Sequence, residues 1–115
     1  YAVVKQGEYG ATLLGRVSAG NLQIFRCPAY PLKTLVDPTG AGDTFLGALA
    51  GYLATLPPGL PSFEEVKRGI VYGTVAASFT CESFSADALL SMTEETFRRR
   101  LEEYAEMCRL PGVSC

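Results

Sequence analysis

The chain has 115 residues, a net charge of −2 and 48% hydrophobic residues, so it is long enough for one small globular domain with a core. The absence of a basic stripe argues against nucleic acid as a partner. The three arginines at residues 98–100 are expected to wrap around a helix and face solvent. No secretory signal opens the chain and no apolar run reaches the ~18 residues of a membrane span, so no membrane partner is expected.

The four cysteines have no C-x-x-C spacing, and the chain contains no histidine. The usual zinc sites are therefore not expected, and a reducing cytoplasm is the expected location.

The first third of the chain is rich in predicted strands. Residues 1–5 and 11–14 are apolar and flank the glycine-containing residues 6–10, which together predict a hairpin. Residues 21–27 alternate in character and predict an edge or exposed strand. Residues 32–36 then lead into a glycine-rich segment.

Two long helices are predicted next. Residues 45–56 are apolar all round, which predicts a helix buried inside a larger assembly. Ser62 and Glu65 have the spacing of a capping box, so a second helix is expected to start there and to continue to about Thr80.

The C-terminal part is also predicted to be helical. Ser85 is expected to cap a short helix at residues 86–91, and Thr93 a last helix. The last helix carries an apolar stripe at helical spacing, which we expect to pack against the core; it consists of Phe97, Leu101, Tyr104 and Cys108.

Residues 37–43 read Asp-Pro-Thr-Gly-Ala-Gly-Asp and open directly into an apolar helix. A helix N-terminus presents unpaired N–H groups and a positive dipole end, and Gly40, Ala41 and Gly42 let an anion approach that backbone. The segment predicts a phosphate cradle, in which Gly42 is expected to adopt a positive φ. Asp43 would repel a bound phosphate, so its expected role is general base for an attacking hydroxyl. A capped helix without a ligand is the alternative.

The segment lacks the lysine of a Walker A loop and the glycine spacing of a dinucleotide loop. From Asp37 to Ala50 it resembles the second signature of the PfkB family, the ribokinase-like sugar and nucleoside kinases, which reads D-x-x-G-A-G-D-x-F. The resemblance implies an α/β, ribokinase-like three-layer fold. Because members of this family are much longer, residues 1–115 are expected to be the C-terminal portion of the kinase domain, with short strands followed by helices and with the nucleotide site and the catalytic base.

Two further segments resemble nucleotide-binding parts of these kinases. Lys5, Gly7 and Gly10 match the strand-end turn that lies against the nucleotide, where Lys5 would contact a phosphate. An ordinary glycine hairpin with a surface lysine is the alternative. Gly73 and Ala77 align with the helix that closes one side of the adenine pocket, although many members have asparagine in place of this glycine. Helix packing alone is the alternative there.

The resemblance implies ATP and Mg²⁺ as cofactors. Asp37 and Thr39 match positions that hold a monovalent cation, usually potassium, in several members, and Thr39 also borders the nucleotide. Residues 81–85 depart from the glycine-containing loop that completes this cation site. Asp37 capping its own turn is the alternative. Magnesium would take oxygen ligands such as Asp37, Glu82 and the phosphates of the substrate.

The expected function is ATP-dependent phosphorylation of a hydroxyl on a small molecule, most often a sugar. Asp43 would take the hydroxyl proton, while the N–H groups from Gly40 to Asp43 stabilise charge on the phosphoryl group. The expected partners are ATP and a sugar or related alcohol, and exposed apolar surface is expected to cause self-association, with a homodimer as its simplest form. The isolated chain is expected to be inactive, because the family draws most sugar contacts from its N-terminal half. A non-catalytic ribokinase-like module used for assembly or regulation is the alternative.

Overall fold

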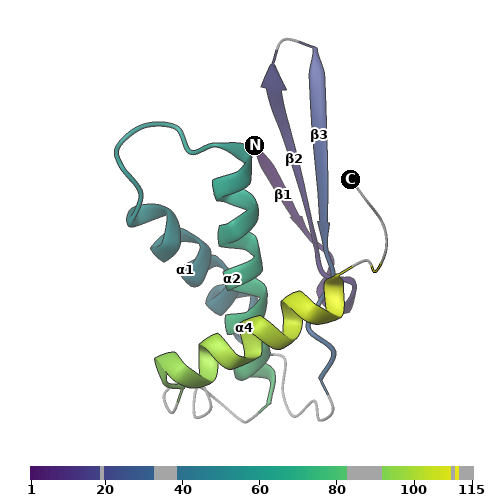
Figure 1. Ribbon diagram of the computed structural model, residues 1–115, viewed down its shortest axis with the longest axis vertical. Coiled ribbons are helices and arrows are strands. Elements are labelled where there is room, and N and C mark those ends of the chain that lie inside the picture. Colours follow the sequence, from purple (N-terminus) through teal and green to yellow (C-terminus); the bar gives the residue numbers. More distant parts are fainter. Residues whose placement is uncertain (19, 33–38, 83–91, 110, 112–115) are drawn as a thin grey trace.

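The computed structural model describes residues 1–18, 20–32, 39–82, 92–109 and 111 (Figure 1). Three antiparallel strands are followed by helices, an α/β arrangement compatible with part of a ribokinase-like fold. The predicted short helix at 86–91 and most of the segment 32–36 lie outside the described residues. The elements are β1 (Ala2–Lys5), a single 3₁₀ turn (Gly7–Tyr9), β2 (Ala11–Ser18), β3 (Asn21–Cys27), α1 (Ala41–Ala54), α2 (Phe63–Cys81) and α4 (Glu94–Cys108).

The sheet has the order β1-β2-β3, with β2 in the centre. Val3 lies opposite Leu13, and Leu13 lies opposite Phe25, so these three side chains share the face that packs against the helices. β2 is longer than the predicted strand because it pairs with β3 up to Ser18. β3 forms an edge of the described sheet, as predicted, and most of its residues are exposed.

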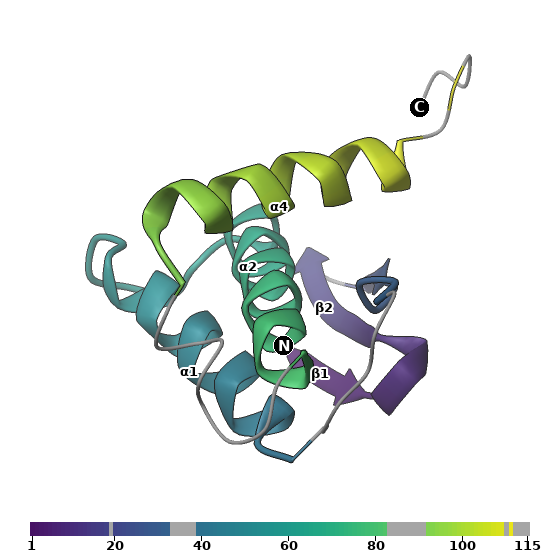
Figure 2. The same ribbon diagram turned by 90° about the horizontal axis from the view of Figure 1, so that it is seen from below.

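Helix α2 is the centre of the fold. Both views place it between α1 and the sheet, and α4 crosses it on another side (Figures 1 and 2). Ile70 and Val75 of α2 are fully buried, in line with this position. The buried core residues come from every layer of the fold: Ala11, Leu13, Cys27, Phe45, Leu49, Phe63, Val66, Ile70, Val75, Phe79 and Tyr104.

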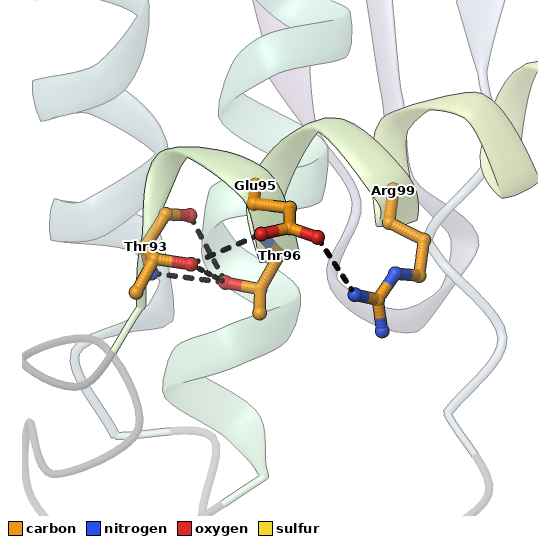
Figure 3. A network of polar contacts seen from close by, with 4 residues as sticks. All are labelled: Thr93, Glu95, Thr96 and Arg99. Atoms are coloured by element: carbon orange, nitrogen blue, oxygen red, sulfur yellow. Dashed lines mark hydrogen bonds and ion pairs between the residues drawn. The ribbon is translucent and has the colours of Figure 1, made fainter.

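Capping boxes start α2 and α4, where the sequence predicts a capping box at Ser62 and Glu65 and a cap at Thr93. The Ser62 hydroxyl accepts a hydrogen bond from the Glu65 N–H at 3.1 Å, and the Glu65 carboxylate accepts one from the Ser62 N–H at 2.8 Å. Thr93 and Thr96 make the same reciprocal pair at the start of α4 (Figure 3). Each pair satisfies backbone donors that the helix cannot satisfy itself.

Helix α1 is covered on one face only by the described residues, and the burial expected inside a larger assembly stays a prediction. Phe45 and Leu49 are buried against α2, whereas Leu46, Gly47 and Gly51 are exposed. The four residues before Phe45 are helical too, because the glycine-rich segment itself forms the first turn.

The apolar stripe of α4 packs as predicted over most of its length. Phe97, Leu101 and Tyr104 contact the core, but Cys108 is exposed because it is the last residue of the helix. None of the described helices is both long and apolar enough to cross a membrane.

Candidate phosphate-binding site

The site is built on the start of α1. Gly40 is its N-cap, with φ of 84° and ψ of −4°, and its carbonyl accepts the first helical hydrogen bond from the Thr44 N–H at 3.0 Å. The N–H groups of Ala41, Gly42 and Asp43 therefore have no partner within the helix. With the positive end of the dipole beside them, these three donors can bind an anion.

The positive φ lies at Gly40 and not at Gly42, which corrects the expectation from the sequence. The chain turns into the helix at Gly40, and Gly42 is already in the first helical turn. Gly42 is nevertheless exposed, and a Cβ added to it would meet no described atom within 4 Å. The space beside this backbone is therefore open to a ligand.

Asp43 occupies the first turn of the same helix and is exposed. Within the described ranges its carboxylate makes no hydrogen bond or ion pair, so a proton donor can reach it. This arrangement places a proton acceptor directly next to the anion-binding N–H groups.

Helix α2 forms one side of the site. Thr80, in its last turn, has its hydroxyl oxygen 2.8 Å from that of Thr44. Its Cγ2 methyl would lie 3.9 Å from a Cβ at Gly40. The end of α2 and the start of α1 are thus in direct contact.

Lys5, the last residue of β1, adds a positive charge. Its ammonium lies over the Phe45 ring, one turn into α1. Partial burial lowers the pKa of Lys5 below its ordinary value, and the nearby Cys27 and Cys81 act in the opposite direction. The structure therefore brings this predicted site residue to the first turns of α1.

The turn after Lys5 is held by its own hydrogen bonds. The Gln6 N–H donates to the Gly10 carbonyl at 2.8 Å, and the Gly10 N–H donates to the Gly7 carbonyl at 3.1 Å. Both glycines have a positive φ. A Cβ at Gly10 would lie 2.1 Å from the Cys27 carbonyl oxygen, so this glycine is required for the close approach of β3. The geometry accounts for a glycine hairpin directly, and a nucleotide contact by these glycines stays a prediction.

Gly73 is buried where α2 meets α1. A Cβ on it would lie 2.8 Å from the Phe45 carbonyl oxygen, so the missing side chain lets the two helices approach. Ala77 is half-buried and packs against the core. Helix packing, the alternative weighed for these two residues, accounts for their positions, and a contact with adenine stays a prediction.

The predicted metal ligands are only partly described. Asp37 lies outside the described residues, and Thr39 is exposed just before the N-cap. Glu82 is paired with Arg100, so it does not offer the free carboxylate that was expected of a magnesium ligand. Over the described ranges, no three acidic or cysteine side chains come together as a metal site. The described residues therefore fit a divalent ion only if phosphate oxygens supply most of its ligands.

Sequence reasoning missed the position of Arg100. Its guanidinium pairs with Glu82, donates to the Ser78 hydroxyl at 2.9 Å and lies 3.8 Å from the centre of the Phe79 ring. The signal was present in the helix spacing, because position 100 is three residues after Phe97 and four before Tyr104. A residue so placed flanks the apolar stripe and cannot face solvent fully.

A helix start whose first N–H groups lack helical partners, with a carboxylate and a lysine beside it, is the kind of site that phosphoryl-transfer enzymes use. The sequence matches the pfkB family carbohydrate kinase profile over residues 1–92, which include the whole of this site. The chain therefore belongs to the pfkB family of carbohydrate kinases. A search of curated proteins finds no match.

Proposed function

We propose that this chain provides the phosphoryl-transfer site of an ATP-dependent kinase whose acceptor is a hydroxyl of a sugar or a related alcohol. The observation that supports this best is the exposed Asp43 carboxylate in the same turn as three N–H groups without helical partners. A kinase needs both features together, because it must activate a hydroxyl and stabilise a phosphoryl group at one place.

In the proposed reaction, Asp43 takes the proton of the acceptor hydroxyl as its oxygen attacks the γ-phosphorus of ATP. The new oxygen–phosphorus bond replaces the bond to the β–γ bridging oxygen, and ADP leaves with the electron pair of that bond. The N–H groups of Ala41, Gly42 and Asp43 donate hydrogen bonds to the transferring group. Lys5 offsets negative charge on the nucleotide.

Magnesium, bound mainly by phosphate oxygens, would neutralise charge on the nucleotide. A monovalent cation at Asp37 and Thr39 stays part of the proposal. The remaining nucleotide contacts are assigned to Gly7, Gly10, Gly73 and Ala77.

The proposal extends to the context of the chain. Residues 1–115 would be the C-terminal portion of a longer kinase domain, and the rest of that domain would supply most of the acceptor contacts. We infer a reducing cytoplasm as its location, and Cys27 and Cys108, which make no disulfide bond within the described residues, are in line with this.

A non-catalytic module used for assembly is the second candidate. The exposed apolar side chains of Leu46 and Ile24, both 62% exposed, favour it because they offer surface for a protein partner or a second copy. The two candidates differ in whether Asp43 is needed as an acid–base group.

The test is Asp43→Asn in a protein that contains this chain together with the rest of the kinase domain. Asn keeps the shape and the hydrogen-bonding reach of Asp but cannot accept the proton, so kcat should fall by about 10²-fold or more. ATP affinity should persist or rise slightly, because a repulsive charge is removed. Turnover is measured with ATP and a panel of sugars, and affinity by calorimetry.

The matched control is Glu94→Gln, which neutralises an exposed acid in the first turn of α4. It should leave kcat unchanged. Near-wild-type kcat in Asp43→Asn would overturn the catalytic assignment and favour the non-catalytic module.

A further inference from the structure

The start of α1 differs from the starts of α2 and α4. Ser62 and Thr93 cap their helices through side chains, whereas Gly40 has no side chain and the cap of α1 has no side-chain hydrogen bond. A side-chain cap would occupy N–H groups that an anion needs. The first turn of α1 must therefore be held in place by contacts from elsewhere in the fold.

Thr80 makes such contacts. It is 4% exposed, and its hydroxyl lies 2.8 Å from the Thr44 hydroxyl while its methyl group faces Gly40. One side chain of α2 thus bonds to the end of the first turn of α1 and lies beside its N-cap. A Cβ at Gly42, in contrast, would meet neither Thr80 nor any other described atom within 4 Å.

The close packing of α1 and α2 brings Thr80 next to the first turn of α1. Gly73, two turns before Thr80, lets the backbone of α1 approach α2 at Phe45. Because Gly40 is conformationally permissive, a small shift of α1 would change the direction of its free N–H groups without breaking the helix. Thr80 opposes such a shift through a partly buried hydrogen bond.

We propose that Thr80 is a positioning residue of the phosphate cradle, holding the N-terminal turn of α1 so that its free N–H groups converge on one phosphate group. This inference rests on the proposed function, since it needs a phosphate ligand at that turn. Thr80 itself does not touch the ligand.

The experiment measures the Kd for ADP by calorimetry on the full 115-residue chain and on three variants. Thr80→Val keeps the shape but removes the hydroxyl, and Thr80→Ser keeps the hydroxyl. Thr74→Val is the matched control, because Thr74 is also buried in α2 but bonds the Ile70 carbonyl and Cys27, not α1. Thermal unfolding of each variant is measured in parallel.

Thr80→Val should weaken ADP binding by about three- to tenfold, the effect of one intramolecular hydrogen bond. Thr80→Ser should restore affinity to within about twofold, because it remakes the bond. Thr74→Val should lower thermal stability and leave the Kd unchanged. If Thr80→Val does not fold, Thr44→Ala removes the same hydrogen bond from the side of α1 and should weaken ADP binding to a similar extent.

Equal affinity in wild type and Thr80→Val would overturn this inference alone, as would an equal loss in Thr74→Val. Wild-type protein that does not bind ADP would overturn the proposed nucleotide cradle together with the inference. The titration of the wild-type protein with ADP therefore distinguishes the two failures.

Discussion

The ammonium of Lys5 lies 4.1 Å from the centre of the Phe45 ring. Lys5 ends β1 and Phe45 lies in the second turn of α1, so this contact joins two elements that are far apart in the sequence. Phe45 is buried and cannot move freely, which fixes the direction of the lysine side chain. The result is a positive charge held beside the start of α1.

Lys5→Met should weaken ADP binding by about tenfold, because it removes a charge that attracts phosphate while keeping an unbranched apolar stem. The loss should shrink as ionic strength rises, since salt screens the lost interaction. Calorimetric titrations of the chain at low and high salt check both statements.

The control for Lys5 is Lys67→Met. Lys67 also lies over a phenylalanine ring, that of Phe25 at 4.8 Å, but it pairs with Glu64 in the first part of α2. The Lys67→Met substitution should change ADP affinity by less than about twofold. Equal effects of the two substitutions would show that Lys5 acts through packing or net charge and does not contact a phosphate.

Gly10→Ala should destabilise the protein severely, by about 4 kcal/mol or more. Its φ is 96°, and the new Cβ would lie 2.1 Å from the Cys27 carbonyl oxygen, so β2 and β3 would have to separate there. Gly20→Ala is the matched control, with φ of 84° and no described atom within 4 Å, and should cost only about 1–2 kcal/mol of backbone strain. Urea unfolding measures both, and similar losses would contradict the close approach at Gly10.

Arg100→Met should lower the free energy of unfolding by about 2 kcal/mol, because it leaves Glu82 without its partner and removes the hydrogen bond to Ser78. Arg100 is mostly buried and Glu82 partly so, which keeps the loss below that of a fully buried pair.

Arg99→Met is the control for Arg100. Arg99 is exposed and pairs with Glu95 at 3.6 Å (Figure 3), so its loss should cost no more than about 0.5 kcal/mol. Equal denaturation midpoints for the two variants would contradict a structural role of Arg100.

The sequence predicts the parts of this fold that depend on local patterns. The capping residues Ser62 and Thr93 predict the starts of two helices, because each hydroxyl accepts a hydrogen bond from a backbone N–H only three residues later in the chain. The start of α1 at the glycine-rich segment is likewise predictable, since Gly40 to Asp43 need no distant partner to leave N–H groups free.

Contacts between elements were beyond sequence reasoning. The Thr44–Thr80 hydrogen bond joins residues 36 apart, and nothing in the local pattern of either helix pairs them. For the same reason the partner of Arg100 on α2 could not be named, and Glu82 was taken for a metal ligand. The face of α1 that α2 covers could not be named either, because an apolar composition all round does not say which face a neighbour covers.

The Tyr104 hydroxyl gives the last prediction, a change of stability at alkaline pH. It donates to the Pro28 carbonyl and lies 3.2 Å from the Cys27 sulfur, in a buried cluster that joins α4 to β3. Burial, assisted by the hydrogen bond to Cys27, raises the pKa of Tyr104 far above its ordinary value of 10.0. Above pH 10.0 the unfolded chain loses the Tyr104 hydroxyl proton while the folded chain keeps it. The folded state then binds more protons than the unfolded state, so stability falls as pH rises.

Tyr104→Phe should therefore be less stable than wild type at pH 7 by about 1 kcal/mol, the value of the lost hydrogen bond. Above pH 10.0 the wild type should lose about 1.4 kcal/mol per pH unit relative to Tyr104→Phe, because only the wild type loses stability through this group, so the difference should reverse sign by about pH 11. The opposite shift of Lys5 is present in both proteins and cancels in the comparison. Urea unfolding at pH 7, 10 and 11 measures the difference, with Tyr9→Phe at an exposed position as the control. A difference between wild type and Tyr104→Phe that stays constant with pH would mean that the Tyr104 proton is not retained by the folded chain.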